Sequence, residues 1–393
     1  MSAMALVATV VPAHAAEPPT VDWFAVAGAR VEDVALDGPG RAAIVGMHKE
    51  FGTERSGVIQ RYGPNGELLW GDEWTPKLGF VYGLGVAVAP NGTVVAVGGI
   101  ECEGYEATGA FVRAYTPGGT LKWSVVTKGG WCRDAVQREK ATGVAVGHGL
   151  VVVVGYAFAC CGLAEDDGWI RAYDLDGTLT WRRNFEVPGI AKGHNDTLEG
   201  IATTPDGFVV TGSVATDPGH DTATPYDTEI VLQSLDVSGA VLWSTVLRDH
   251  GIKDWDQGTD VAVRGGRIIA VGKEDRGWSR PSPERGWIAR FTADGDLGWM
   301  HRWDADTAAN GVSIGPDGTV WVVGEEPKTP AGGSAIRIRA YDPEGTRLWS
   351  LRRNPDGRWA SATAVAADDL GAFVAGSSGW VRDGGRLWRY VNA

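Results

Sequence analysis

Apolar runs separated by glycine-bearing turns recur along almost the whole chain. The stretch 84–99 (LGVAVAPNGTVVAVGG) places one apolar run on each side of Asn91-Gly92. A two-residue Asn-Gly turn between such runs predicts a β-hairpin. Seven stretches of this kind are present. Their equivalent apolar positions are Val34, Val86, Val144, Ile201, Val261, Val312 and Ala364.

A second phrase follows each of the first six hairpins. The stretch 115–124 (YTPGGTLKWS) is typical: an aromatic or apolar residue stands eight places before a tryptophan, and a glycine stands four places before it. The tryptophans are Trp70, Trp123, Trp181, Trp243, Trp299 and Trp349. The phrase predicts strand, glycine turn and strand, so each repeat holds two hairpins. The period of roughly 50 to 60 residues lies in the range of four-stranded propeller blades.

The seventh repeat is incomplete at the C-terminal end, and an unassigned Trp23 lies in 20–28 (TVDWFAVAG). We therefore predict an all-β fold over 20–393: a single seven-bladed β-propeller of four-stranded antiparallel blades, with the ring closed by the N-terminal strand completing the last blade. The competing architecture, an open solenoid of stacked sheets, needs caps at both ends and does not explain half a repeat at each end.

The repeat resembles those of known groups of proteins. The stretch 86–99 followed by 110–124 (AFVRAYTPGGTLKWS) is similar to the repeat of bacterial seven-bladed propellers of the SBBP type. The stretch 340–350 (AYDPEGTRLWS) also resembles the phrase of quinoprotein-like, PQQ-type propellers. The likeness covers nearly all of 20–393. It implies the propeller fold, and it says little about function because such repeats record how blades pack.

Composition and charge narrow the setting. A hydrophobic content of 44% and a charged content of 22% are ordinary for a folded protein. The net charge of -13 argues against nucleic acid or an anionic membrane surface as partner, because both attract basic surfaces.

Residues 1–16 predict a secretory signal peptide, since an apolar run ends in Ala13-His14-Ala15. No Lys or Arg precedes that run, so a disordered apolar tail is the alternative. No other segment has the length of a membrane span. We expect a monomer that is secreted, periplasmic or on the cell surface.

The loops divide into two classes. Turns inside hairpins are short, and His148 occupies one of them. Links between hairpins are long and polar, and they fall together on the other face of the propeller. Long loops on a rigid scaffold are where binding usually occurs. We therefore expect an unknown protein, glycan or small molecule to bind there, at the mouth of the central channel. Aromatic residues suited to stacking on such ligands are Tyr105, Trp131, Trp255, Trp278 and Trp359.

All four cysteines fall on the long-loop face. In an exported protein they predict disulfides. Cys102 with Cys132, and Cys160 with Cys161, is the favoured pairing, and Cys132 with Cys160 or Cys161 is its rival. The quinoprotein resemblance implies that neighbouring cysteines stack on a PQQ ring. However, those dehydrogenases have eight blades, and neither their calcium ligands nor their catalytic aspartate can be matched in this sequence. A PQQ-type oxidoreductase is thus a second alternative function, and loop-stapling disulfides are the simpler interpretation.

Three histidines with nearby acids surround the fourth repeat, namely His194, Asp196, His220, Asp221 and His250. Imidazole and carboxylate groups on facing loops can hold a metal or exchange protons. They define the first alternative function, a metal-assisted hydrolase or lyase. Their spacing matches no fixed ligand motif, so solvated loop histidines are the competing interpretation.

Alternating acids in 254–260 (DWDQGTD) resemble a cation-binding loop. Asp254, Asp256 and Asp260 would supply the oxygen ligands that calcium prefers, so calcium is the one cofactor to which the sequence points. A structural function at the start of the blade competes with this interpretation. No complete catalytic motif is present. We therefore predict a secreted propeller that binds a ligand or protein through its long-loop face without catalysis.

Overall fold

A computed structural model of the chain describes most of its 393 residues. The described ranges are 18–38, 40–49, 55–75, 80–101, 108–127, 137–159, 167–190, 196–216, 228–248, 255–275, 284–303, 307–326, 333–354, 359–379 and 384–391.

Each blade is a four-stranded antiparallel unit, and we number the blades in chain order. Blades 1 to 4 consist of β2 (Arg30–Leu36), β3 (Ala42–Lys49), β4 (Arg55–Tyr62), β5 (Leu68–Trp74); β6 (Phe80–Val88), β7 (Val94–Glu101), β8 (Thr108–Tyr115), β9 (Leu121–Val126); β10 (Gln137–Gly147), β11 (Leu150–Ala159), β12 (Asp167–Asp174), β13 (Leu179–Asn184); and β14 (Thr197–Thr204), β15 (Gly207–Ala215), β16 (Thr228–Asp236), β17 (Val241–Leu247). Blades 5 to 7 consist of β18 (Trp255–Arg264), β19 (Arg267–Asp275), β20 (Glu284–Phe291), β21 (Leu297–Arg302); β22 (Ala308–Ile314), β23 (Val320–Glu326), β24 (Ala335–Tyr341), β25 (Arg347–Arg353); and β26 (Trp359–Asp368), β27 (Gly371–Gly379), β28 (Gly385–Val391), β1 (Thr20–Val26).

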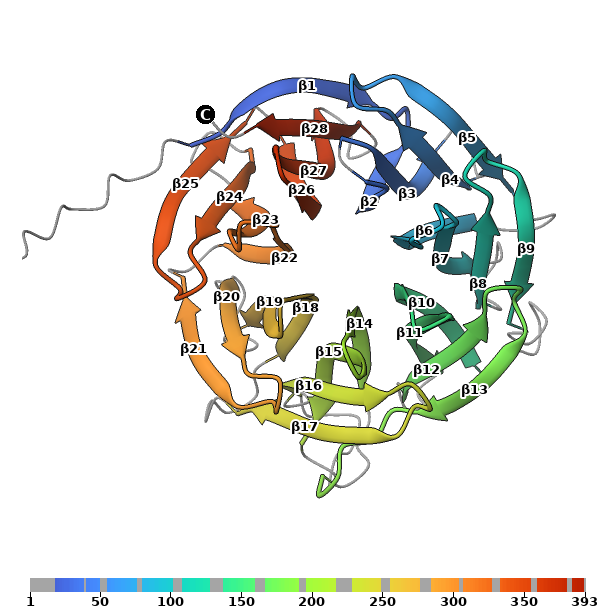
Figure 1. Ribbon diagram of the computed structural model, residues 1–393, viewed down its shortest axis with the longest axis vertical. Helices are drawn as coiled ribbons and strands as arrows, with labels where there is room; N and C mark the ends of the chain where they lie inside the picture. The colour runs from blue at the N-terminus through green and yellow to red at the C-terminus, as the bar shows by residue number, and fades with distance from the viewer. Residues whose placement is uncertain are drawn as a thin grey trace, which may run out of the picture.

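The blades stand around a central channel, with the first strand of each blade innermost (Figure 1). The sequence-based prediction of an all-β propeller is confirmed. Three pairs of adjacent blades are also joined by single parallel bridges, Arg55↔Phe80, Thr228↔Trp255 and Arg285↔Thr307. Among the described residues no sheet continues around the whole ring. No helix in the described part of the chain is long and apolar enough to cross a membrane.

The two ends of the chain share the last blade. β1 pairs antiparallel with β28 from Thr20↔Val391 to Val26↔Arg386. The sequence assigned the N-terminal strand to this blade, and the pairing places it there.

The innermost strand of every blade carries a β-bulge at the same place. In β2 the register shifts between Val31 and Asp33, so Glu32 is the extra residue. The position of the bulge also corrects the alignment of the repeats at one residue. Val365 pairs with Val374 as Val34 pairs with Ile44, so Val365 and not Ala364 is the equivalent of Val34. A run of alanines around this position had hidden the one-residue offset.

The repeated phrase forms the joint between neighbouring blades. Its glycines adopt positive φ, for example 89° at Gly119 and 88° at Gly177. Five of the six indoles lie against the glycine turn of the next blade, namely those of Trp70, Trp123, Trp181, Trp243 and Trp299. Trp70 Nε1 donates a hydrogen bond to Pro117 O at 3.0 Å. These indoles therefore pack between neighbouring blades.

The core lies between the blades. Each hydrophobic cluster of the described residues spans two neighbouring blades; one combines Val152 and Ile170 of blade 3 with Phe208 and Val210 of blade 4. A further cluster joins Phe373 of blade 7 to blade 1. A single blade cannot bury both of its faces, so stability comes from these contacts between blades.

Candidate functional site

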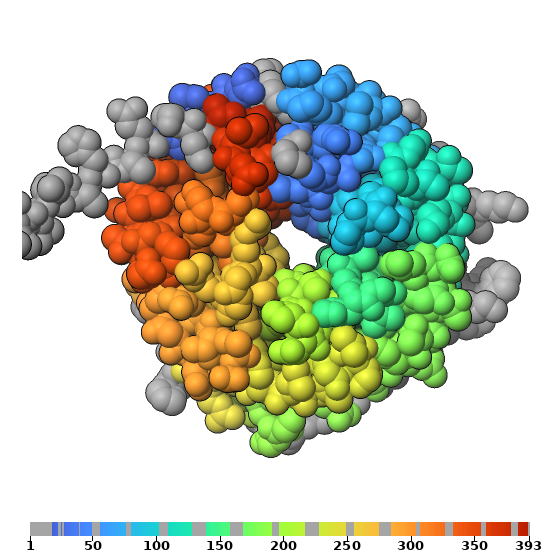
Figure 2. Space-filling view, viewed as in Figure 1, coloured from blue at the N-terminus to red at the C-terminus, as the bar shows by residue number. Residues whose placement is uncertain are grey.

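A cavity of about 540 Å³ occupies the centre of the ring, and Figure 2 shows its opening between the blades. Its lining combines the beginnings of innermost strands with the ends of second strands. Arg30 is the first residue of β2, and Glu325 is the second-to-last residue of β23. These strand ends join the long links between hairpins. The cavity therefore opens toward the face where the sequence predicted binding.

The bulges supply a ring of inward-facing side chains. All seven bulge residues line the cavity, namely Glu32, Leu84, Thr142, Glu199, Thr259, Asn310 and Thr363. A bulge re-aims one side chain without breaking the strand pairing around it. The repeat thus delivers one variable position per blade to the channel.

Four bulge residues tie their blade to the next one. The Oγ1 atoms of Thr142 and Thr363 donate to Leu198 O at 2.6 Å and to Val31 O at 3.0 Å. Thr259 and Asn310 make the same contact with the carbonyl oxygens of the following blades. These donors are therefore engaged within the protein.

Asp33 and Asp260 make a second kind of contact between blades. Each directly follows a bulge residue. Each carboxyl group accepts one hydrogen bond from the backbone amide of the next residue in the chain and one from a backbone amide of the next blade. Asp33 Oδ2 accepts from Val86 N at 2.8 Å, and Asp260 Oδ2 accepts from Val312 N at 2.8 Å. Burial raises the pKa of Asp33 to about 6 and that of Asp260 to about 7, and the charge of Asp33 adds to the shift at Asp260.

Two glutamates occupy bulge positions where four other blades have hydrogen-bond donors. Glu32 forms an ion pair with Arg30 at 2.6 Å, and Glu199 Oε1 accepts from Gln257 Nε2 at 2.9 Å. Burial raises the pKa of each glutamate to about 7, despite the opposing effects of these partners. Both carboxyl groups therefore change protonation near neutral pH.

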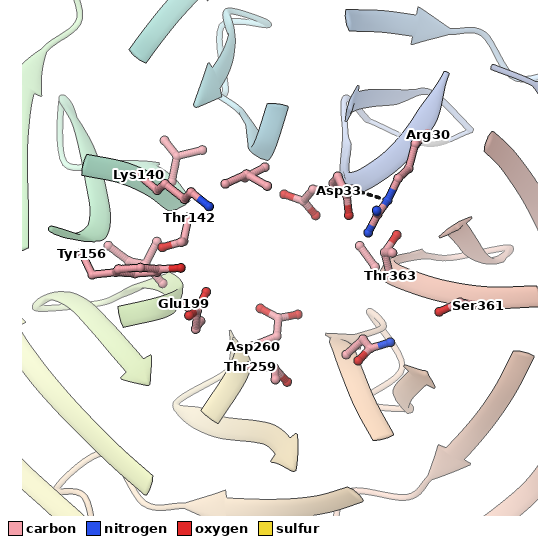
Figure 3. Close-up of a pocket in the computed structure, with 18 of the residues that line it drawn as sticks. Arg30, Asp33, Lys140, Thr142, Tyr156, Glu199, Thr259, Asp260, Ser361 and Thr363 are labelled. Atoms are coloured by element: carbon pink, nitrogen blue, oxygen red, sulfur yellow. Dashed lines mark ion pairs between the residues drawn. The ribbon is translucent and has the colours of Figure 1, made fainter. Parts of the chain in front are cut away.

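An aromatic ring and a lysine complete one wall. Tyr156 and Lys140 pair across β10 and β11 and line the cavity beside Glu199 (Figure 3). Lys140 Nζ lies 3.5 Å from Glu101 Oε1 and 5.7 Å from the centre of the Tyr82 ring. Figure 3 shows Asp33 on the wall opposite Glu199 and Asp260. Ionisable groups from several blades thus face one space.

The predicted aromatic residues are only partly placed at this site. Trp359 is half-buried and lines a pocket of about 110 Å³ that shares Arg30, Glu325 and Ser361 with the channel cavity. Trp255 is 55% exposed at the start of β18 and does not line the cavity. Tyr105, Trp131 and Trp278 lie outside the described residues, as do Cys102, Cys132, Cys160 and Cys161.

Most of the predicted histidine site and one predicted calcium ligand lie outside the described residues, which exclude His194, His220, Asp221, His250 and Asp254. Asp196 is buried and accepts a hydrogen bond from Ala215 N at 2.9 Å. Asp256 is buried within blade 5, whereas Asp260 faces the channel. No three His, Cys, Asp or Glu side chains of the described part converge as a metal site requires. His148 forms a turn with φ of 54°, as predicted.

Sequence reasoning missed Glu32, Asp33 and Glu199, and it treated Asp260 as a calcium ligand. The sequence does mark these acids. Asp33 and Asp260 stand directly before the equivalent apolar position of a first hairpin. Glu32 and Glu199 stand two places before it. Four repeats have glycine directly before that position and three have threonine two places before it, whereas blades 1, 4 and 5 have an acid at one or both places.

Comparison with known proteins gives only distant likenesses. No family model matches the chain, and no curated protein matches it. The β-propeller domain of the Trilobed protease from Pyrococcus furiosus is 11% identical, with 93% of this chain and 94% of that chain covered and a TM-score of 0.49. The gluconolactonase XC5397 from Xanthomonas campestris is 14% identical, with 97% and 99% covered and a TM-score of 0.39. Acylaminoacyl peptidase from Pyrococcus horikoshii is 10% identical with a TM-score of 0.47; 92% of this chain is covered, but only 51% of the peptidase.

Proposed function

We propose that this protein is a non-catalytic binding propeller that takes a small polar ligand into the channel cavity from its long-loop face. The observation that carries the proposal is the gathering of Asp33, Glu199 and Asp260, from three different blades, around one cavity of about 540 Å³. That volume lies in the range of small-molecule sites. Carboxyl groups whose pKa values are raised by burial, when they line a cavity, are candidates for a functional site.

The site deepens the expectation drawn from the sequence. The polar contacts lie on the innermost strands, and those strands begin where the long links between hairpins end in the sequence. Sites built on strands hold their geometry better than sites built on loops alone. Trp359, whose small pocket adjoins the cavity, is the predicted loop aromatic that fits this arrangement.

The experiment reduces the cavity with a larger side chain and measures which ligands no longer bind. Leu84 is the apolar bulge residue of blade 2 and lines the channel, so Leu84→Trp reduces the space available. Leu297→Trp on the exposed outer strand β21 is the matched control. A panel of amines, sugars, carboxylic acids and short peptides is screened by thermal shift. We expect at least one ligand class that stabilises the wild type and the Leu297→Trp protein but not Leu84→Trp. Ligands that stabilise all three proteins equally, or none at all, would refute the channel site.

Three finer points belong to the same proposal. The chain is exported through its N-terminal segment, it is related to the SBBP-type propellers, and β1 closes the ring by locking the last blade. The pairing of β1 with β28 supports the last of these. A strand supplied by the other chain end prevents the first and last blades from separating without breaking a sheet.

A further inference from the structure

We propose that the ligand of the channel cavity is a linear organic dication, a diamine or polyamine whose ammonium groups reach carboxylates on opposite walls. This inference rests on the proposed function, because it names the ligand class of the same cavity.

The cavity offers acceptors, and four of its neutral donor side chains are engaged. The side chains of Thr142, Thr259, Asn310 and Thr363 donate to backbone carbonyls of the next blade. The carboxylates have lone pairs to spare, since a carboxylate accepts about four hydrogen bonds. A ligand that brings donors therefore matches the carboxyl groups of this lining. An ammonium group brings three donors and no acceptor.

The charge balance points the same way. Five carboxyl groups and two cationic side chains line the cavity. Arg30 is paired with Glu32, and Lys140 is paired with Glu101, which lies outside the lining. In the described part of the chain no cation lies within ion-pair distance of the other four lining acids, which are Asp33, Glu199, Asp260 and Glu325. A cation entering the cavity would compensate that charge at low dielectric, where the interaction is strong.

The distribution of the acids favours an organic dication over a metal ion. Calcium requires six to eight oxygen ligands around one point. The lining acids come instead from opposite sides of the ring, with Asp33 facing Glu199 and Asp260 (Figure 3), and no three acidic or other metal-ligating residues of the described ranges converge. Two charges at the ends of a flexible chain match this separation. Tyr156, beside Glu199, supplies an aromatic ring for the alkyl chain or an ammonium group.

Binding of a dication must displace protons. Burial raises the pKa of Glu199 and Asp260 to about 7 and that of Asp33 to about 6, so Glu199 and Asp260 are partly protonated at pH 7. Groups of fixed positive charge near Glu199 are Lys140 and Lys273, and both already lower its pKa. An added ammonium group acts in the same direction, so the acids ionise as the ligand binds. Affinity should therefore fall as the pH is lowered through about 7 to about 5.

The test is calorimetric titration of the full chain with α,ω-diamines of increasing length, each matched with the diol of the same length. We expect the diamines to bind, with an optimum at one chain length, and the diols to bind at least tenfold more weakly. Titration in two buffers of different ionisation enthalpy should show proton release at pH 7, a readout that needs no variant. Glu199→Gln should weaken diamine binding about tenfold, whereas Glu344→Gln on an exposed turn should leave it unchanged.

The outcomes separate the two proposals. If diols or sugars bind as well as diamines, and Leu84→Trp removes that binding, the channel site stands and the dication inference is wrong. If calcium binds more tightly than any diamine in the same cavity, the organic assignment is wrong. If diamines bind equally to the wild type, Glu199→Gln and Leu84→Trp, they bind elsewhere and the inference is wrong. An unchanged melting temperature of Glu199→Gln without ligand shows that the variant is folded.

Discussion

Trp123 of blade 2 packs directly on Gly177 of blade 3. A Cβ atom added to Gly177 would lie 2.7 Å from Trp123 Cδ2, and Trp123 Nε1 donates to Leu175 O at 2.9 Å in the same turn. The tryptophan and the glycine of the repeated phrase are therefore two halves of one joint, each contributed to a different neighbour. This explains why both recur together.

The first prediction concerns that joint. Gly177→Ala should lower the free energy of unfolding by more than about 2 kcal/mol, because alanine strains the positive φ of 88° and its methyl group displaces the indole. Gly149→Ala is the control, since Gly149 has φ of 75° but nothing within 4 Å of an added Cβ. It should cost only the conformational part, about 1 kcal/mol. Urea unfolding measures both, and equal losses would contradict the joint.

The fold could be predicted because it depends on contacts that repeat. Gly119 and Trp123 recur at fixed spacing since every blade must pack on the next in the same way. The one error in the alignment, at Ala364, arose where alanines replaced the larger residues that mark the register.

The site could be predicted only as a region. The repeat indicated the face and the channel mouth, but not which side chains turn inward. The inward direction of these side chains depends on the β-bulge at Glu32, Glu199 and their equivalents. A bulge is a property of how two strands pair, so the sequence of a single repeat does not show it. Glu32, Asp33 and Glu199 lie within the repeat, at positions that a single copy does not distinguish from residues that pack the blades.

The second prediction concerns the contact between blades 7 and 1. Arg389 and Asp368 form a buried ion pair at 2.6 Å, and Asp368 Oδ2 also accepts from Gly40 N at 3.0 Å. Arg389→Met should cost about 3 kcal/mol, because it leaves a buried carboxylate without its cation. Arg352→Met removes the partly exposed pair with Glu326 and should cost less than about 1 kcal/mol. Thermal and urea unfolding compare the two variants. Similar losses of stability would show that the buried ion pair stabilises the fold no more than the partly exposed one.

The third prediction is a pH dependence of stability. Burial raises the pKa of Glu32, Glu199 and Asp260 to about 7, so the folded state binds protons that the unfolded state has lost. Their contribution is complete below the unfolded pKa values and is lost as the pH rises through about 7. The free energy of unfolding should therefore fall between about pH 5 and about pH 7.5. Asp236, whose pKa the Ser238 hydroxyl lowers by a hydrogen bond, titrates below this window.

The variant that isolates this effect is Glu199→Gln, which removes one titrating group and keeps a polar partner for Gln257. Its stability should fall less steeply with pH than that of the wild type, by up to one proton in the slope. Urea unfolding at a series of pH values measures the slope. A slope unchanged by the substitution, or a stability that rises with pH over this window, would contradict the assignment.

The fourth prediction tests ring closure by β1. Removal of residues 1–26 takes away the partner of β28 and exposes that edge, along with the buried side chains of Leu387 and Tyr390 in the last blade. The truncated protein should melt at a lower temperature and self-associate, because an uncovered strand edge pairs with other chains. Removal of residues 1–17, which leaves β1 intact, should change neither property. Light scattering after size exclusion detects association, and a peptide of residues 18–29 added to the truncated protein should reverse it. A monomeric truncated protein with the melting temperature of the full chain would show that β1 does not close the ring.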